Sequence, residues 1–385
     1  PTFLLVQKCG LKQYWIDAAG RSVQGVKMKK IVFFLSIFYS LLGKSQIIRN
    51  YSNEFMNIGN GARGLAMGNA VVASQMDIYS QTHNPAGLTS ISSDWQGAVM
   101  HSEYFESIAK YDYVGYAKSI DTNSSFAISI IRFGVDNILD TTKMIDNEGN
   151  IDYDKISKFS QADYAGIISY GFHPSGNHKL SLGLNTKLIY RNVGKFANAF
   201  GFGFDVGAIY QDDRDWRFGA MLKDATTTMN FWSINQSKLS TIVNGEELNP
   251  IPKEKIELTM PTLNLGISRT FEINRDLNFT PEVDLHIDFT RTNTLVSTDV
   301  LSFSPSLGAE LSWQDIIFVR AGLNEFQNIT NPFHQQNKVS FQPSAGIGIK
   351  YKGLSLDYDI SNSGIGGSNL YSNFFSLKLD MSGFR

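Results

Sequence analysis

The sequence contains very little cysteine, has no long apolar run and carries no excess of positive charge. Its 385 residues include one cysteine, Cys9, which leaves no disulfide framework. No apolar run reaches roughly eighteen residues, and this excludes a membrane-spanning helix. Lys and Arg number 34 against 36 Asp and Glu, without a basic stripe, so we expect no nucleic-acid partner.

The longest apolar stretch lies near the N-terminus and is typical of an export signal. Met28–Lys30 form a basic head, Ile31–Leu42 an apolar core, and Gly43–Ser45 end with small residues. This pattern predicts a Sec signal peptide over residues 28–45. We interpret residues 1–27 as a spurious upstream extension. Without residues 1–45 the chain loses seven of its basic residues, one acidic residue and Cys9, which leaves a formal charge of −8 and no cysteine for a lipid anchor.

The rest of the chain holds many short segments in which apolar and polar residues alternate. In Phe200–Gln211 one face holds Phe200, Phe202, Phe204, Val206, Ala208 and Tyr210, and the other holds Gly201, Gly203, Asp205 and Gly207. Such a period of two predicts strands with one apolar and one polar face. Most segments have about ten residues, the length of a tilted strand that crosses a bilayer. The fourteen segments are 95–104, 111–120, 124–133, 161–172, 178–191, 200–212, 215–224, 257–270, 276–289, 301–313, 315–324, 339–350, 353–361 and 373–382.

The gaps between these segments alternate between short and long. This is the arrangement of an outer-membrane barrel, with tight periplasmic turns and longer external loops. We therefore predict an all-β fold, a 14-stranded antiparallel transmembrane β-barrel over residues 93–385, in the cell outer membrane and in contact with its lipid. A large soluble antiparallel β protein is the alternative.

Residues 46–92 do not alternate and are rich in Gly, Asn and Ala. We predict that this segment is an N-terminal plug folded into the barrel; a free periplasmic arm is the alternative. Within it, Asn84-Pro85-Ala86-Gly87 has the residues of a type I turn, since Asn can bond the backbone two positions on and Pro fixes φ.

The same segment carries a distinctive motif. Its residues are Gly61, Ala62, Arg63, Met67, Gly68, Asp77, Asn84, Pro85, Ala86, Gly87 and Leu88. The passage resembles the PorV/PorQ family of outer-membrane proteins of the type IX secretion system, whose wider relatives are the fatty-acid transporters. Asn69-Ala70 and Thr82-His83 depart from the family pattern.

The resemblance implies a non-enzymatic role. A PorV-like protein would be a shuttle or accessory subunit that binds secreted cargo proteins, or translocon and attachment components, for surface display. The alternative function is transport of hydrophobic small molecules through a kinked wall, with Pro281 and Pro305 as the candidate kinks. A purely structural subunit is a third hypothesis.

One long gap, residues 225–256, is the candidate partner-binding loop because large apolar side chains outside a membrane need a partner. These side chains are Phe231, Trp232, Ile234, Leu239 and Ile242. The aromatic residues near strand ends, including Tyr111, Tyr113, Tyr164, Tyr190 and Trp313, are interpreted as an interfacial girdle.

No pattern predicts catalysis, a metal or a cofactor. Glu282, Asp284, His286 and Asp288 share one strand face, but alternate positions lie too far apart for one ion, and we expect cationic partners such as Lys187 or Arg217. The acidic loop from Asp146 lacks the glycine and glutamate of a calcium loop. We expect Arg63 to form a structural salt bridge that locks the plug; the alternative is a functional residue that gates the lumen or pairs with lumen acids such as Asp205 or Glu282.

Overall fold

The computed structural model describes residues 52–146, 148–239, 242–243, 246–247, 255–330, 337–362 and 370–381. The predicted upstream extension and signal peptide, residues 1–45, lie outside the described residues, as does the side chain of Ile242. No helix of the described residues has the length and apolar character that crossing a bilayer requires.

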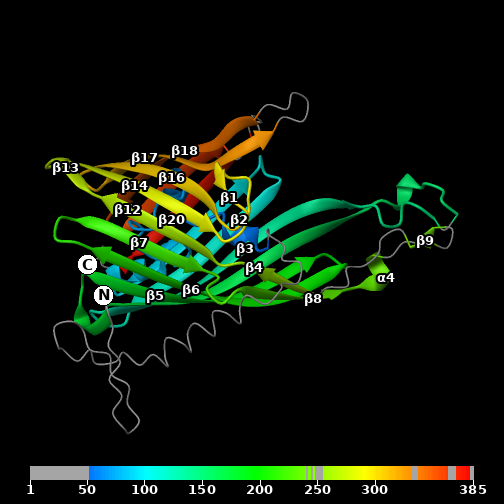
Figure 1. Ribbon diagram of the computed structural model, residues 1–385, viewed down its shortest axis with the longest axis horizontal. Coiled ribbons are helices and arrows are strands. Elements are labelled where there is room, and N and C mark those ends of the chain that lie inside the picture. The colour runs from blue at the N-terminus through cyan, green and yellow to red at the C-terminus, as the bar shows by residue number, and fades with distance from the viewer. Residues whose placement is uncertain are drawn as a thin grey trace, which may run out of the picture. The chain divides into compact units, whose positions relative to one another are not determined.

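Fourteen antiparallel strands form a closed barrel, which confirms the predicted fold class (Figure 1). The first and last strands pair with each other along eight residues and so complete the wall. In order around the wall the strands are β1 (Trp95–Tyr104), β2 (Ala109–Ser119), β3 (Ser124–Asp140), β4 (Ser157–Phe172), β5 (Leu180–Val193), β6 (Ala197–Gln211), β7 (Trp216–Lys223), β12 (Thr262–Arg269), β14 (Leu277–Asp288), β16 (Ser302–Trp313), β17 (Ile317–Thr330), β18 (Asn337–Tyr351), β19 (Leu354–Asn362) and β20 (Tyr371–Asp380).

The alternating residues sort onto the two faces of the wall as the sequence pattern predicts. On β6, Phe200, Phe202 and Phe204 are exposed on the outside, with Phe200 63% exposed. Asp205 and the glycines between them face inward and are buried. An outside of this kind suits lipid and an inside of this kind suits a polar filling.

Six short strands and several short helices supplement the barrel. Within the described residues they are β8 (Thr228–Ile234), β9 (Ile242–Val243), β10 (Glu246–Glu247), β11 (Ile256–Thr259), β13 (Phe271–Asn274), β15 (Val296–Ser297), α4 (Gln236–Leu239), η3 (Tyr153–Lys155) and η4 (Pro174–Gly176). Strand β8 pairs with the first six residues of β6 and with β11. Strands β8 and β11 therefore extend the wall beyond β7 and β12.

Part of the predicted partner-binding loop is regular structure. Phe231, Trp232 and Ile234 lie on β8 and Leu239 lies on α4. Two outer connections expected to be long are tight turns, residues 105–108 and 194–196, because the flanking strands continue to them. Polar strand ends outside the lipid lack the alternation that reveals the membrane part.

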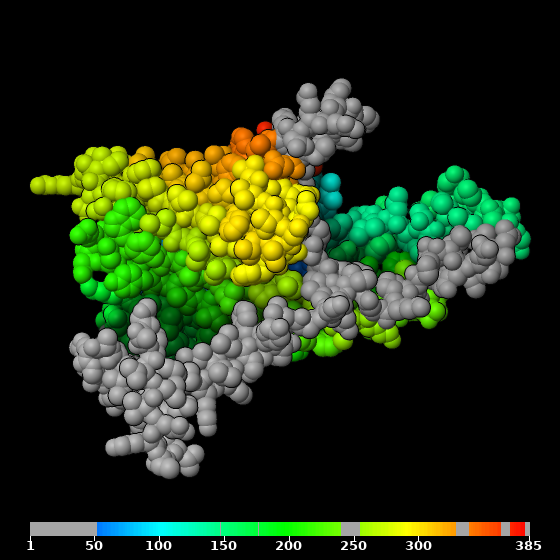
Figure 2. Space-filling model, viewed as in Figure 1, coloured from blue at the N-terminus to red at the C-terminus, as the bar shows by residue number. Residues whose placement is uncertain are grey.

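Strands β3 and β4 continue past the rest of the barrel and form an extended arm with β8 and α4 (Figures 1 and 2). A bulge between Val135 and Ile138 separates the membrane part of β3 from this extension. Phe196, in the β5–β6 turn, packs edge-on against Phe159 of β4. The arm lies at the end of the barrel that carries the long connections.

The prolines proposed as kinks pair on one edge only. Between β14 and β16, Pro281 pairs with Ala309 and Pro305 pairs with Leu285 in a continuous register. On the other edge of each strand the pairing stops beside the proline: β16 and β17 pair only as far as Leu307, and β12 and β14 pair only as far as Glu282. The kinks stay a prediction. The breaks lie at residues 224–227, between β7 and β8, and at Met260–Pro261, between β11 and β12.

Only some of the aromatic residues predicted to form an interfacial girdle lie on the outer face. Tyr164, Tyr170, Trp313, Tyr351 and Phe375 are exposed on the outer face. Tyr111 and Tyr113 face inward and are buried, with Tyr111 fully covered. Tyr113 packs on Tyr79 of the N-terminal segment, with ring centroids 5.3 Å apart.

Candidate functional site

The N-terminal residues 52–94, here called the inner segment, pack against inward-facing side chains of the barrel wall. The segment contains η1 (Glu54–Met56), α2 (Ala62–Ala66), α3 (Ser80–His83) and η2 (Pro85–Ser90), joined by tight turns. Its short helices leave many polar groups that the wall satisfies. The Ala62 N–H donates to Ser376 Oγ of β20 at 3.1 Å, and Asn185 Nδ2 of β5 donates to the Gln81 carbonyl at 2.7 Å.

Arg63, the charged residue of the motif, binds Glu310 of β16 through both carboxylate oxygens. Its Nε lies 2.9 Å from Oε2 and its Nη2 lies 3.2 Å from Oε1. Arg320 of β17 also binds Glu310, at 2.6 Å, and Asp357 of β19 at 2.6 Å. Arg63 therefore joins a network that ties the inner segment to three strands. Neither Asp205 nor Glu282, the lumen acids named from the sequence, forms the ion pair with Arg63. Asp205 instead binds Lys187 at 2.7 Å.

Asp77, another motif residue, forms an ion pair with Lys378 of β20. Burial alone would raise the pKa of the Asp77 carboxyl, but the Lys378 ammonium and its hydrogen bond hold that pKa below its ordinary value. Asp77 also accepts hydrogen bonds from Gln75 Nε2 and from the Tyr79 N–H. The residue fixes both a turn and a contact with the wall.

The Asn84-Pro85 turn forms as its residues predict. Asn84 Oδ1 accepts the Ala86 N–H at 3.2 Å, and the Gly87 N–H donates to the Asn84 carbonyl at 3.0 Å. Asn84 Nδ2 donates to the carbonyls of Val72 and Ala208, each at 3.0 Å. One side chain thus holds the turn, a neighbouring turn and β6 together.

Inward-facing glycines of the wall allow the inner segment to approach backbone to backbone. A Cβ on Gly322 of β17 would lie 2.1 Å from the Gly68 nitrogen. A Cβ on Gly183 of β5 would lie 2.3 Å from the Ala86 nitrogen. Gly68 itself has φ +63°, which a side chain would strain. The motif residues Met67, Gly68 and Ala86 therefore lie where the wall lacks side chains.

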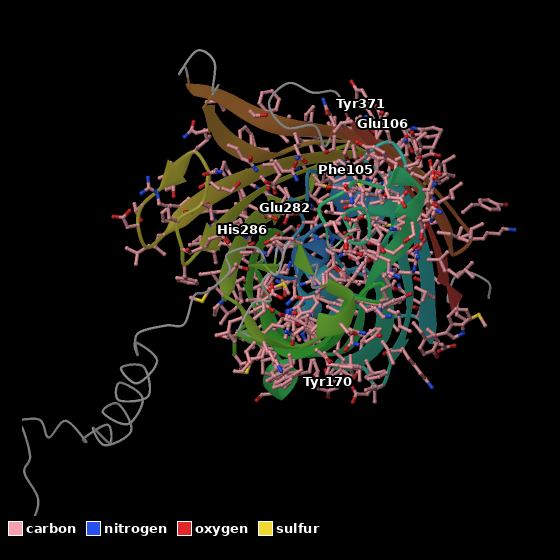
Figure 3. All side chains as sticks on the ribbon, turned by 90° about the vertical axis from the view of Figure 1, so that its right-hand side faces the viewer. Phe105, Glu106, Tyr170, Glu282, His286 and Tyr371 are labelled. Carbon is pink, nitrogen blue, oxygen red and sulfur yellow. The ribbon has the colours of Figure 1, made fainter. Side chains whose placement is uncertain are left out.

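Two carboxyl groups of β14 accept the backbone of the inner segment. Asp284 Oδ2 accepts the Val72 N–H at 3.0 Å, and Glu282 Oε1 accepts the Ala73 N–H at 2.6 Å. The expectation of cationic partners for this strand face is therefore wrong for these two residues. His286, further along β14, binds Asn264 through Nδ1 and Asp288 through Nε2, the latter at 3.0 Å. In Figure 3, Glu282 and His286 lie on the inner side of the wall, whereas Tyr170 points outward.

His83, named from the sequence only as a departure from the family pattern, is a buried histidine of the inner segment. Its Nε2 lies 3.0 Å from the Asn60 carbonyl oxygen. Burial lowers the pKa of the imidazole to about 4, so the ring is neutral at pH 7 and Nε2–H donates to the carbonyl. A single histidine in a sequence gives no signal of such burial.

A cavity of about 450 Å³ lies between the inner segment and the part of the wall formed by β7, β12, β14 and β16. Its lining is rich in carboxylate, amide and hydroxyl groups. Among the lining residues are Glu54, Asn57, Lys223, Asp284, His286 and Glu325. Among the residues that the structure describes, no group of three His, Cys, Asp or Glu side chains is placed to hold a metal ion.

Two of the apolar residues expected to bind partners face different surroundings on β8. Trp232 is partly buried: its Nε1–H donates to Glu257 Oε2 at 2.7 Å, and the Arg191 guanidinium lies 5.2 Å from the ring centroid. Phe231 is exposed on the outer face. Trp232 therefore supports the wall extension, and Phe231 continues the apolar exterior of β6.

No family model and no curated protein matches the chain. Solved structures match it over most of its length. The toluene transporter TodX of Pseudomonas putida is 14% identical with a TM-score of 0.53, over 83% of this chain and 96% of TodX. The monoaromatic hydrocarbon channel CymD is 12% identical with a TM-score of 0.52, over 84% of this chain and 98% of CymD. The toluene transporter TbuX of Ralstonia pickettii is 13% identical with a TM-score of 0.51, over 84% and 98%.

At these identities the likeness shows the fold alone. The chain shares the barrel fold of these neighbours, whose names describe channels and transporters. The narrower resemblance to PorV and PorQ depends on the motif of the inner segment.

Proposed function

We propose that the chain is a PorV-like, non-enzymatic outer-membrane barrel that binds partner proteins outside the membrane and serves protein secretion or surface display. The partners would be secreted cargo or components of the type IX translocon or attachment machinery. The observation that carries the proposal is the arm formed by β3 and β4, which extends past the barrel and exposes apolar side chains.

The arm has the composition of a binding surface. Leu139 is 61% exposed, Ile151 is 56% exposed and Tyr153 is 70% exposed. All three lie beyond Arg132, where the apolar outer face of β3 ends in an ion pair with Asp112. Exposed apolar groups outside the lipid suit a protein surface, because contact with another chain removes them from water.

The inside of the barrel supports binding over conduction. The inner segment contacts strands on several sides of the lumen, and Arg63 and Asp77 form ion pairs with the wall. We therefore propose that the segment acts as a plug. The cavity above it is polar, whereas a site for an apolar molecule is lined mainly by apolar side chains.

The second candidate function is transport of hydrophobic small molecules, in line with the alternative from the sequence. The fold neighbours favour this candidate over a secretion role, because those with TM-scores above 0.5 are hydrocarbon channels and transporters. The motif with Arg63 and Gly68 and the polar cavity favour the first. Both candidates are tested in the same strains.

The test replaces the exposed apolar residues of the arm in the triple variant Leu139→Ser, Ile151→Ser, Tyr153→Ser. The barrel should insert normally, because none of these residues lies in the membrane part of the wall. We expect co-purification of envelope proteins from native membranes to fall at least about tenfold, as loss of a central apolar contact costs about 1.4 kcal/mol or more.

The matched control changes polar residues of the same arm, Lys143→Ser, Glu148→Ser and Asp154→Ser, and should keep its partners. An unchanged set of partners in the apolar variant would refute the protein-binding proposal. Uptake of labelled toluene or fatty acid that is lost in a null strain, and restored equally by both variants, would support the transporter instead.

A further inference from the structure

On one side of the barrel, pairing between neighbouring strands stops before the end that carries the arm. Strands β12 and β14 pair up to Thr262 and Asp288. Beyond Met260–Pro261, β11 pairs with β8 along one edge, and the described residues provide no strand for its other edge. We call this place the seam. A strand edge without a neighbour can add an extended segment of another chain through its backbone groups.

The polar cavity lies directly inside the seam. Thr259, Met260 and Pro261 line it from one side of the seam, and Asp288, Phe289 and Thr290 line it from the other. A segment added at the edge of β11 would direct alternate side chains inward, toward the cavity. The backbone edge and the cavity are therefore parts of one surface.

The cavity contains more acidic than basic side chains. Its carboxylates include Glu54, Asp284, Asp288 and Glu325, and its basic residues are Lys223 and the histidines. The neutral His83 adds no charge, and Lys223 donates to Asn57 Oδ1 at 3.1 Å instead of to a carboxylate. A fifth carboxylate, Asp224, is held by Lys187 at 2.5 Å.

Asp284 is the buried member of this group. It is 4% exposed, and its Oδ2 accepts the Val72 N–H. Its carboxyl group contacts the buried carboxyl group of Glu282, and neither Asp284 Oδ1 nor Glu282 Oε2 has a basic partner among the described residues. Two buried carboxyl groups in contact are costly when both are charged, and a nearby ammonium or guanidinium group would relieve that cost.

We infer that the seam and its cavity bind an extended segment of a partner protein and receive one Lys or Arg side chain of that segment in the cavity. This inference rests on the proposed protein-binding function and names the chemistry of the partner. The edge of β11 supplies backbone hydrogen bonds, and Glu54, Asp288 and Glu325 supply attraction for the positive charge. The hydroxyl and amide groups of the lining suit the polar stem.

The experiment measures binding of a fluorescent eight-residue peptide of alternating Thr and Val with a central Lys to the full purified barrel in detergent. The same peptide with Nε-acetyl-lysine should bind at least about tenfold more weakly, because it lacks the charge. The same peptide with two Pro residues beside the Lys should also bind at least about tenfold more weakly, because Pro lacks the donor needed for strand pairing.

The barrel variant Glu54→Gln, Asp288→Asn, Glu325→Gln should lose at least about tenfold in affinity for the Lys peptide. A matched variant with the same change of charge in the opposite turns, Asp213→Asn, Glu272→Gln, Asp315→Asn, should bind as the wild type does. The separate variant Asp284→Asn keeps an acceptor for the Val72 N–H and tests the buried oxygen alone.

Equal binding of the Lys and acetyl-lysine peptides would overturn the inference, and so would tight binding of the proline peptide. Binding of free lysine amide as tightly as the peptide would also overturn it, in favour of a small amine as the ligand. The apolar arm variant should still bind the peptide, so a failure at the seam is distinguishable from a failure of the arm to hold partner proteins.

Discussion

Arg63 and Arg320 share the carboxylate of Glu310, and this arrangement explains why the motif needs an arginine. The Nε atoms of both guanidinium groups donate to the same oxygen, Glu310 Oε2, and each group has a further acceptor, Gln75 for Arg63 and Asp357 for Arg320. A lysine could neutralise the charge but could not supply two parallel hydrogen bonds to Glu310. The bond to the wall depends on that geometry.

Burial of His83 makes the inner segment sensitive to acid. The pKa of the imidazole is about 4 in the folded protein against about 6.5 in the unfolded chain. Between these values the unfolded chain binds more protons, so stability is complete above about pH 6.5 and falls as the pH drops toward 4. The full effect is about 3 kcal/mol.

We expect His83→Gln to flatten this dependence, measured as the protection of the inner segment from trypsin between pH 4 and pH 8. The control His178→Gln changes an exposed turn and should behave as the wild type does. A wild-type profile that matches the profile of His83→Gln would contradict the assignment.

The contacts of individual side chains were the hardest feature to predict from the sequence. The turn at Asn84 is local, so its hydrogen bonds followed from the residue types. The partner of Arg63 lies 247 residues away, and it depends on how the inner segment sits against the wall, which no local pattern encodes. The same holds for the contacts of Glu282 and Asp284 with the backbone.

At the scale of elements, glycines of the wall decide how closely the inner segment docks. Gly322→Ala would place a Cβ 2.1 Å from the Gly68 nitrogen and 2.2 Å from the Met67 carbonyl carbon. Because both atoms belong to backbone, one of the two elements must shift. We expect a loss of about 1–3 kcal/mol in the free energy of unfolding, measured by urea titration in detergent.

Gly166→Ala is the matched control for this change. Gly166 also lies within a barrel strand, β4, but a Cβ there meets nothing within 4 Å. Its unfolding curve should coincide with that of the wild type or lie slightly above it. Equal losses in the two variants would show that strand glycines matter for a reason other than docking.

Strands were predicted well wherever they cross lipid. The alternation on β5, β6 and β16 is imposed by an apolar outside and a filled inside, so it is visible in the sequence. The extensions of β3, β4 and β6 and the added strands β8 and β11 lie outside that constraint, and their ends were missed. The breaks at residues 224–227 and 260–261 depend on pairing in three dimensions.

At the scale of the whole molecule, the ring of contacts around the inner segment predicts a barrel that conducts poorly. We expect no steady current through the wild-type protein in a planar bilayer. Arg63→Glu would set two carboxylates against each other at Glu310 and should produce frequent channel openings. Arg63→Lys keeps the attraction but loses the paired hydrogen bonds to Glu310, so its openings should be more frequent than in the wild type and rarer than in Arg63→Glu.

A steady large current through the wild type would refute the plug proposal. The Arg63→Glu protein must still show the heat-dependent gel shift of a folded barrel. If it then gives no channel openings, Arg63 does not hold the segment. Both results are read from single-channel recordings on the same preparations.

The pairing of β1 with β20 also has a consequence for biogenesis. The wall becomes a continuous cylinder only when residues 371–380, almost the last of the chain, reach their place beside residues 96–103. The inner segment comes before β1 in the sequence, and we expect it to enter the interior before the final strand closes the wall. On this expectation, contacts such as the ion pair between Asp77 and Lys378 of β20 would help to place the last strand beside the first.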